Sequence, residues 1–463
     1  MAAWRNALAR ASQVEKERLN RILMIGVPII VGMLSQSLMN LVDAAMVGRL
    51  GGNELAAIGV GSYASFLVVS AMMGLSAAVQ AIVARHHGGG RTAESTEPLF
   101  AGITLTLIAG IPMTLFFLLL APQYLALYTN DQTVIDIAVP YFQWRTAALI
   151  FVGMAFVFRG FWSGIGEAWV YLRITLIMHI SNAVLSWLFI YGTADWGTGI
   201  AALDNWSGYG ATGSGIGSAA ALLLAAILFF WHTFVTNHAR FSVHYHLSGR
   251  TLRQLTRLAI PNSIQQTLFA LGVSVLFFII GLLGTDEQAI GHILTQLSLL
   301  LIMPAVGLGI AGASLVGHAL GAEEKENAHR WGWDVVRVSM VMMAVMGLPL
   351  WIAPDWVLHL FTPDEALVAL GEWPLRIIGF SIPFEVAAII LTQTLLGAGA
   401  SKQVMKINLV MQWLVFLPLA WIIGPYLGFG LIGVWLLQSL NRITLSLIYG
   451  TLWGRKQWVH IKV

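Results

Sequence analysis

The feature that most constrains this chain is a series of long apolar stretches, each about the length of one membrane-spanning helix. A span takes about 20 mostly apolar residues, and twelve such stretches fit within the 463 residues. They cover 22–47, 55–84, 99–120, 134–158, 170–191, 215–235, 258–282, 289–319, 335–353, 367–396, 404–423 and 431–452. Only 10% of the residues are charged, which leaves little chain for a soluble domain. We expect an all-α integral membrane protein with twelve transmembrane helices.

The distribution of Lys and Arg between the loops predicts the orientation of the chain. Segment 1–21 holds five of these residues, and segment 236–257, between the sixth and seventh spans, holds four. The alternate loops together contain one, Arg49. Because loops rich in Lys and Arg stay in the cytoplasm, we expect both termini to be cytoplasmic. The setting would be a bacterial-type inner membrane.

Charge and composition exclude several classes of protein. The formal charge of +3 comes from basic residues scattered singly at span ends, which form no patch for nucleic acid. The absence of cysteine excludes disulfides, thiolate metal sites and cysteine nucleophiles. A membrane-embedded enzyme would need clustered His, Asp or Glu at membrane depth, and no such cluster is evident. We therefore expect no enzyme, no metal and no cofactor.

The two halves of the sequence are related by a constant shift. Moving the chain by 233 positions aligns Pro28 with Pro261, Gly51 with Gly284, Asp131 with Asp364 and Gly166 with Gly399. Each repeat holds six spans, so both start on the same side and are parallel repeats. Transporters built in this way bind their substrate between the halves and rock one half against the other.

The repeat predicts the domain organisation. The expected parts are a cytoplasmic N-terminal segment 1–21, an N-lobe 22–235, a cytoplasmic linker 236–257, a C-lobe 258–453 and a cytoplasmic tail 454–463. Segment 192–213 departs from the symmetry, because its counterpart 424–430 is much shorter. We expect this insertion to lie at the outer interface, where its Trp and Tyr residues are favoured.

The first span contains a carboxylate, Asp43, with no basic residue within a helical turn. Pro28, Gly32, Gln36, Asn40 and Asp43 follow at steps of four, four, four and three residues, which places them on one helix face. A polar face of this kind is expected to line a cavity. Removal from water favours a neutral carboxyl, so Asp43 is a candidate proton carrier. The alternative is a structural Asp held by Asn40 or by a neighbouring helix. Pro28 bends its helix, as a hinge or as a static kink.

The fifth span carries a second polar stripe. Thr175, His179, Asn182 and Ser186 follow at steps of four, three and four residues. Two such stripes predict one shared pocket, in which Asn182 donates to Asp43 or lends its carbonyl to a cation. Hydrogen bonding between helices is a sufficient alternative for Asn182 and His179.

The tenth span contains the second intramembrane carboxylate, Glu385. It is a candidate to titrate or to attract a cationic substrate, and the alternative is a structural ion pair with Arg376 or Arg145. Further polar residues that could line a substrate cavity are Gln36 and His179 in the first half and Gln265, Gln266, His292 and Gln296 in the second. Core hydrogen bonding is the alternative for the second-half group.

Several motifs resemble the multidrug and toxic compound extrusion family of the multidrug/oligosaccharidyl-lipid/polysaccharide flippase superfamily. They are Pro28, the run Asn40-Leu41-Val42-Asp43-Ala44-Ala45-Met46-Val47-Gly48-Arg49-Leu50-Gly51, Arg159-Gly160 with Gly164-Ile165-Gly166-Glu167, and Leu396-Gly397-Ala398-Gly399. The resemblance covers essentially the whole chain. It implies antiport, in which protons or sodium ions enter as drugs leave, with Asp43 at an ion site.

The chain departs from both branches of the family it resembles. Ser186 stands where the proton-coupled members are expected to carry Asp after the Asn182 motif. Glu385 falls at the tenth-span acidic position of the sodium-coupled branch, whose seventh-span Glu corresponds to Phe269. The coupling ion therefore stays open between H⁺ and Na⁺. We expect an ion or proton site formed by Asp43, Asn182, Asn40 and Ser186, with Glu385 as a candidate in the C-lobe.

These observations together predict a monomeric, ion-coupled antiporter that exports small organic cations or drugs across the lipid bilayer. The main alternative is a flippase for lipid-linked precursors, which would need a cationic cavity for phosphate groups. Arg145 and Arg376 are too few to favour it.

Overall fold

The computed structural model describes residues 2–194, 206–241 and 248–461, and within these ranges it contains helices and no strands. The helices are α1 (Ala2–Ser12), α2 (Lys16–Gly48), α3 (Gly52–Gly88), α4 (Thr96–Leu119), α5 (Ala121–Leu125), α6 (Gln132–Ala147), α7 (Leu149–Ile165), α8 (Ala168–Tyr191), α10 (Ala211–Phe230), α11 (Gly249–Gly281), α12 (Thr285–Gly321), α13 (Lys325–Ile352), α14 (Pro354–His359), α15 (Glu365–Gly397), α16 (Ser401–Leu409), α17 (Leu417–Trp421) and α18 (Gly430–Gly454). Eleven helical segments can each cross a membrane by length and composition, and α6 with α7 forms a twelfth, bent span. The predicted all-α fold with twelve spans is confirmed.

The fourth span is broken, which the sequence did not indicate. Residues 134–158 were expected to form one helix, but α6 and α7 meet at Ala148 with a bend of 44°. The repeat shift places Ser381 opposite Ala148. Ser381 lies inside the continuous helix α15, so the two lobes differ at this point.

The backbone reproduces the sequence repeat at its turns. Gly51 and Gly284, which precede α3 and α12, have φ of 153° and 155°. Gly166 and Gly399, after α7 and α15, have φ of 91° and 85°. Only glycine adopts such values readily, which explains why glycine occupies these positions in both halves.

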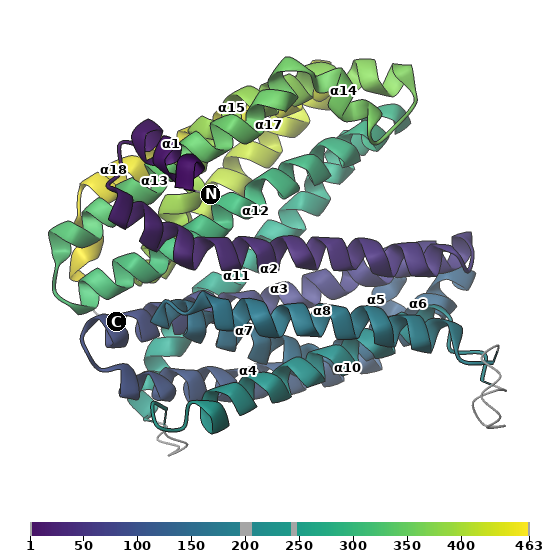
Figure 1. Ribbon diagram of the computed structural model, residues 1–463. Coiled ribbons are helices and arrows are strands. Elements are labelled where there is room, and N and C mark those ends of the chain that lie inside the picture. Colours follow the sequence, from purple (N-terminus) through teal and green to yellow (C-terminus); the bar gives the residue numbers. More distant parts are fainter. Residues whose placement is uncertain (1, 195–205, 242–247, 462–463) are drawn as a thin grey trace.

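The helices are arranged as two lobes that meet at one end of the molecule (Figure 1). Both chain termini lie at this end, which we call the terminal end. The lobes diverge toward the far end, where α5 and α14 lie on opposite lobes (Figure 1). The helices α3 and α11 pack closely at Gly74, where an added Cβ would overlap the Ser263 backbone.

The first halves of α2 and α11 pack against the opposite lobe. In α2, Leu19, Ile22 and Ile29 are fully buried in a cluster with residues of α12, α13 and α15. In α11, Leu255 and Leu258 are buried in a cluster with residues of α3, α4, α7 and α10. The two leading helices therefore cross between the lobes reciprocally. The lobe boundaries at 22–235 and 258–453 stay predictions.

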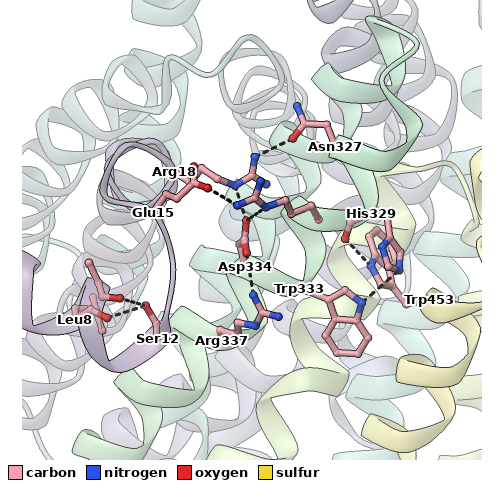
Figure 2. Close-up of polar contacts among 12 residues, drawn as sticks. Leu8, Ser12, Glu15, Arg18, Asn327, His329, Trp333, Asp334, Arg337 and Trp453 are labelled. Carbon is pink, nitrogen blue, oxygen red and sulfur yellow. Dashed lines mark hydrogen bonds and ion pairs between the residues drawn. The ribbon is translucent and has the colours of Figure 1, made fainter.

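A buried ion pair attaches the start of α2 to the C-lobe (Figure 2). Arg18 Nε donates to Asp334 of α13 at 2.5 Å, and the two side chains are only 11% and 3% exposed. The Arg18 guanidinium also lies 3.6 Å from the centroid of the Trp331 ring and donates to Asn327 at 2.8 Å. We infer that α2 is fixed at its start by a charge that is well compensated.

The insertion at 192–213 is described only at its ends. Residues 195–205 lie outside the described part of the chain. At its base, the Thr193 N–H donates to the Trp206 carbonyl at 2.9 Å, and the Trp206 ring contacts Phe189 and Tyr209. The expected position of this loop at the membrane interface stays a prediction.

Candidate functional site

The two predicted polar stripes meet at Asp43 and Asn182. Asp43 lies in the last third of α2, on the side that packs against α8. Asn182 Nδ2 donates to the two carboxylate oxygens of Asp43 at 3.3 and 3.5 Å. Ser186, one turn further along α8, donates to Asn182 Oδ1 at 3.4 Å. All three side chains are buried, so the two stripes meet in a compact polar contact, and the shared pocket stays a prediction.

Asp43 has no ion pair among the residues that the structure describes. Its contacts at hydrogen-bonding distance are the long bonds from the neutral amide of Asn182. The Arg145 guanidinium acts on it electrostatically from a greater distance. A buried carboxylate of this kind is held in place without having its charge neutralised by a touching cation.

The other members of the two stripes do not hold Asp43. Asn40 accepts a hydrogen bond from Gln36 Nε2 at 3.2 Å, and both side chains are exposed. His179 is buried, and neither ring nitrogen has a hydrogen-bond partner within the described ranges. Asp43 is therefore held by a side chain of the neighbouring helix, which is the second form of the structural alternative, and within the described ranges it has no hydrogen bond to Asn40. Pro28 is buried inside the continuous helix α2.

Glu385 lies in a second buried polar site in the C-lobe. Ser381 donates to its Oε1 at 2.5 Å, and Ser381 is bonded to Ser439 of α18 at 2.9 Å. The Nε of Arg442, also on α18, lies 3.9 Å from Glu385 Oε2. The structural alternative for Glu385 named the wrong partner, because Arg376 instead binds Glu372 at 2.8 Å.

A small cavity adjoins Glu385. Its volume is about 10 Å³, which is about the minimum for one water molecule. Its lining includes Ser298, Trp435, Gln438 and Arg442. In this conformation the cavity has room for a water or a small ion, and not for a drug-sized molecule.

The remaining predicted cavity residues do not gather at one site. Gln266 Nε2 lies 3.8 Å from the Met73 sulfur of α3, and the Oε1 of Gln265 is buried without a partner within the described ranges. The His292 ring lies 5.7 Å from Phe277, and Gln296 is exposed. None of these four is among the described residues that line the Glu385 cavity.

Sequence reasoning missed Arg442, although a signal was present. It is the single charged residue within the predicted span 431–452, and an intramembrane Arg is a marker of a polar partner. The pairing itself was not visible, because α15 and α18 are separated in the sequence by two further helices. Among the described residues, no group of three or more His, Asp or Glu could hold a metal ion.

The twelve spans in two lobes (Figure 1) define a polytopic membrane protein built from two related halves. A family model described as MatE matches residues 28–188 and 261–422. These blocks begin at the two equivalent prolines of the repeat. The chain belongs to the MatE family.

Related proteins extend over nearly the whole chain. A "Probable multidrug resistance protein NorM" from Pseudomonas syringae pv. tomato is 26% identical over 452 residues, 93% of this chain and 94% of the relative. A protein of the same name from Pseudomonas aeruginosa is 27% identical over 432 residues, 90% and 85% of the two chains. A MOP superfamily transporter from Pyrococcus furiosus has a similar structure, with a TM-score of 0.85, 20% identity and 95% of each chain covered.

Proposed function

We propose that this protein is an ion-coupled antiporter that exports organic cations or drugs by alternating access. The relatives named as multidrug resistance proteins support the export of small compounds. We further propose that it works as a monomer in an inner membrane, with both termini in the cytoplasm. The export of organic cations and the coupling to an ion rest on the N-lobe site.

The observation that carries the proposal is the buried Asp43 carboxylate without a touching cation. Its neighbours at hydrogen-bonding distance are neutral, and a charge at membrane depth is costly unless it is compensated. A proton, a sodium ion or a cationic substrate could each supply the compensation. Because one carboxylate satisfies one cation at a time, binding of the ion and of the substrate would be mutually exclusive, which is the requirement for antiport.

Asn182 and Ser186 support this exchange. The Asn182 amide orients the carboxylate, while its Oδ1 accepts a hydrogen bond from Ser186 at 3.4 Å. A carbonyl oxygen has two lone pairs, so Oδ1 keeps acceptor capacity for a cation. Asn40, Gln36 and His179 would provide further polar surface along the path to this site.

The C-lobe carboxylate is assigned a different role. Arg442 lies 3.9 Å from Glu385, so the C-lobe site already contains a cation of its own. We propose that Glu385 chiefly positions Arg442 and the α15–α18 contact. A cation at Glu385 would have to compete with this guanidinium.

The arrangement of the lobes suggests which state is present. The lobes are packed together at the terminal end and diverge at the far end (Figure 1). With cytoplasmic termini this would be an outward-facing state. Pro28 lies within the part of α2 that packs on the C-lobe, 15 residues before Asp43. It is our proposed hinge.

The test is uptake of tetraphenylphosphonium into proteoliposomes under separately imposed pH and sodium gradients. We expect one gradient to drive uptake in the wild type and Asp43→Asn to abolish it, with normal amounts of protein in the membrane. Asp136→Asn is the matched control, because Asp136 is an exposed N-lobe carboxylate that accepts from Gln132. Normal gradient-driven uptake by Asp43→Asn would contradict the proposed role.

A further inference from the structure

The helices α3 and α12 cross at the terminal end with reciprocal close contacts. A Cβ on Gly88 of α3 would overlap the backbone of His318, and a Cβ on Gly321 of α12 would overlap the backbone of Arg85. The repeat shift relates Gly88 to Gly321 and Arg85 to His318. The crossing is therefore a two-fold contact between equivalent positions of the two lobes.

At this crossing each lobe donates a side chain to the backbone of the other. Arg85 donates to the Ala398 carbonyl at 2.9 Å and to the Ile461 carbonyl at 2.8 Å. His318 Nε2 lies 2.6 Å from the Gly164 carbonyl. A carbonyl can only accept, so this ring nitrogen carries the hydrogen. Two equivalent positions thus make the same kind of bond in opposite directions.

The acceptors lie at equivalent helix ends. Gly164 is in the last turn of α7, and Ala398 directly follows α15. The last carbonyls of a helix lack intrahelical partners, and the negative end of the helix dipole favours a cation or an N–H donor. Gly166 and Gly399, which follow α7 and α15, have positive φ, and this conformation terminates the two helices. This gives the two glycine motifs after the fourth and tenth spans a physical role.

Two buried residues reinforce the crossing. Gln80 Nε2 of α3 donates to the Ile310 carbonyl at 2.7 Å and to Ser314 Oγ at 2.8 Å, both on α12. Ser314 in turn donates to the Ser163 carbonyl of α7 at 2.6 Å. We call Gln80, Arg85, Ser314 and His318 the interlobe clasp. Separation of the lobes at the terminal end would have to break all of its bonds between the lobes.

We propose that Arg85 and His318 are positioning residues of the transport cycle, which hold the terminal end closed and release it when the far end closes. This inference rests on the alternating access of the proposed function. Arg85 and His318 reach the opposite lobe through backbone carbonyls at helix ends. The bonds can therefore re-form whenever the lobes return, whatever side chains lie nearby.

The absence of native cysteine allows a direct test by distance measurement between paired spin labels. Ala93→Cys with Gln403→Cys reports on the terminal end, and Thr133→Cys with Ala366→Cys reports on the far end, all at exposed positions. Arg85→Met and His318→Phe each remove the side-chain donors of the clasp. We expect each to shift the populations toward a longer terminal-end distance and a shorter far-end distance. Loss of one charge-assisted hydrogen bond should change the ratio of the two conformational populations by about tenfold.

Matched variants separate the clasp from general damage. His318→Gln and Arg85→Lys keep a donor and should restore most of the original distribution. Arg91→Gln should change nothing, because Arg91 is exposed and pairs with Glu94 of its own lobe. Gly321→Ala forces the crossing apart by volume alone and should shift the distances in the same direction.

The outcome that overturns the inference is a set of unchanged distance distributions in folded Arg85→Met, His318→Phe and Gly321→Ala proteins. The measurement needs no transport, so it stands apart from the proposed function. Altered distances together with normal transport by Asp43→Asn would retain the clasp and reject the ion site. Unchanged distances together with an inactive Asp43→Asn variant would reject the clasp and retain the ion site.

Discussion

The N-lobe and the C-lobe share one backbone plan but compensate their buried acids in different ways. Asp43 is held by a neutral amide, whereas Glu385 lies beside Arg442. The repeat shift places Leu276 opposite Asp43 and Val152 opposite Glu385. Each lobe therefore has its polar site where the other has an apolar residue. The repeat specifies the scaffold, and the proposed function rests on the departures from it, in line with sites grafted on a common fold.

The largest effect that would sharpen this comparison is on transport. We expect Asp43→Asn to lower gradient-driven uptake of tetraphenylphosphonium to the level of empty liposomes. The double variant Glu385→Gln/Arg442→Gln removes the other acid together with its cation and should keep uptake within the same order of magnitude as the wild type. If the double variant were inactive while remaining folded, the functional difference between the lobes would be lost.

The next largest effect concerns the anchors of the two leading helices. Arg18 of α2 is bonded to the buried Asp334, whereas the equivalent Thr251 of α11 donates to Glu97 at 2.7 Å. Breaking a buried ion pair costs about 3–5 kcal/mol when the remaining charge is left unpaired. Because Arg337 still lies 3.4 Å from Asp334, Arg18→Met should lower stability in detergent by less than this, about 2–3 kcal/mol. Thr251→Val, which removes the donor to Glu97, should cost about 1 kcal/mol, as for one ordinary hydrogen bond. Equal losses in the two variants would show that the anchors do not differ.

A smaller effect is expected at the C-lobe site. Arg442 is 22% exposed and its contact with Glu385 is 3.9 Å, so the pair is looser than the one at Arg18. Glu385→Gln alone leaves a partly buried cation and should cost about 1–3 kcal/mol, below the usual cost for a tight buried pair. The double variant Glu385→Gln/Arg442→Gln should recover part of this loss. Thermal unfolding of these variants gives the interaction energy between Glu385 and Arg442. A value of zero would show that this ion pair does not stabilise the protein.

The smallest effect tests the shared scaffold. Asp131 and Asp364 cap the starts of α6 and α15, and each accepts a backbone N–H bond at 2.9 Å. Loss of such a cap costs about 1 kcal/mol, so Asp131→Ala and Asp364→Ala should lower stability by similar amounts. A clear difference between them, measured in the same detergent, would mean that the lobes are not equivalent even where their backbones agree.

Much of the fold was predictable, because the signals are local or periodic. Hydrophobic length gives the twelve spans, and the constant shift gives the two halves. The contact between Asp43 and Asn182 followed from two polar stripes that had to avoid lipid. These inferences depend only on spacing within one helix or on a comparison of the chain with itself.

The remaining features depend on contacts between distant helices. Arg442 meets Glu385 only because α18 packs against α15, and the first half of α2 lies in the C-lobe cluster because of the crossing of the lobes. Arg85 and His318 occupy equivalent positions, but their different side chains conceal the relation in the sequence. The break at Ala148 has no proline or glycine at the bend, so no residue there signals it in the sequence.

The most direct test of the exchangeable charge in the N-lobe is competition between ion and substrate in the purified protein. Tetraphenylphosphonium binding would be measured by equilibrium dialysis over a series of pH values and sodium concentrations. In the wild type and in Glu385→Gln/Arg442→Gln, we predict that the coupling ion weakens binding in proportion to its concentration. In Asp43→Asn this dependence should disappear. Competition that persists in Asp43→Asn and vanishes in the C-lobe variant would contradict the account.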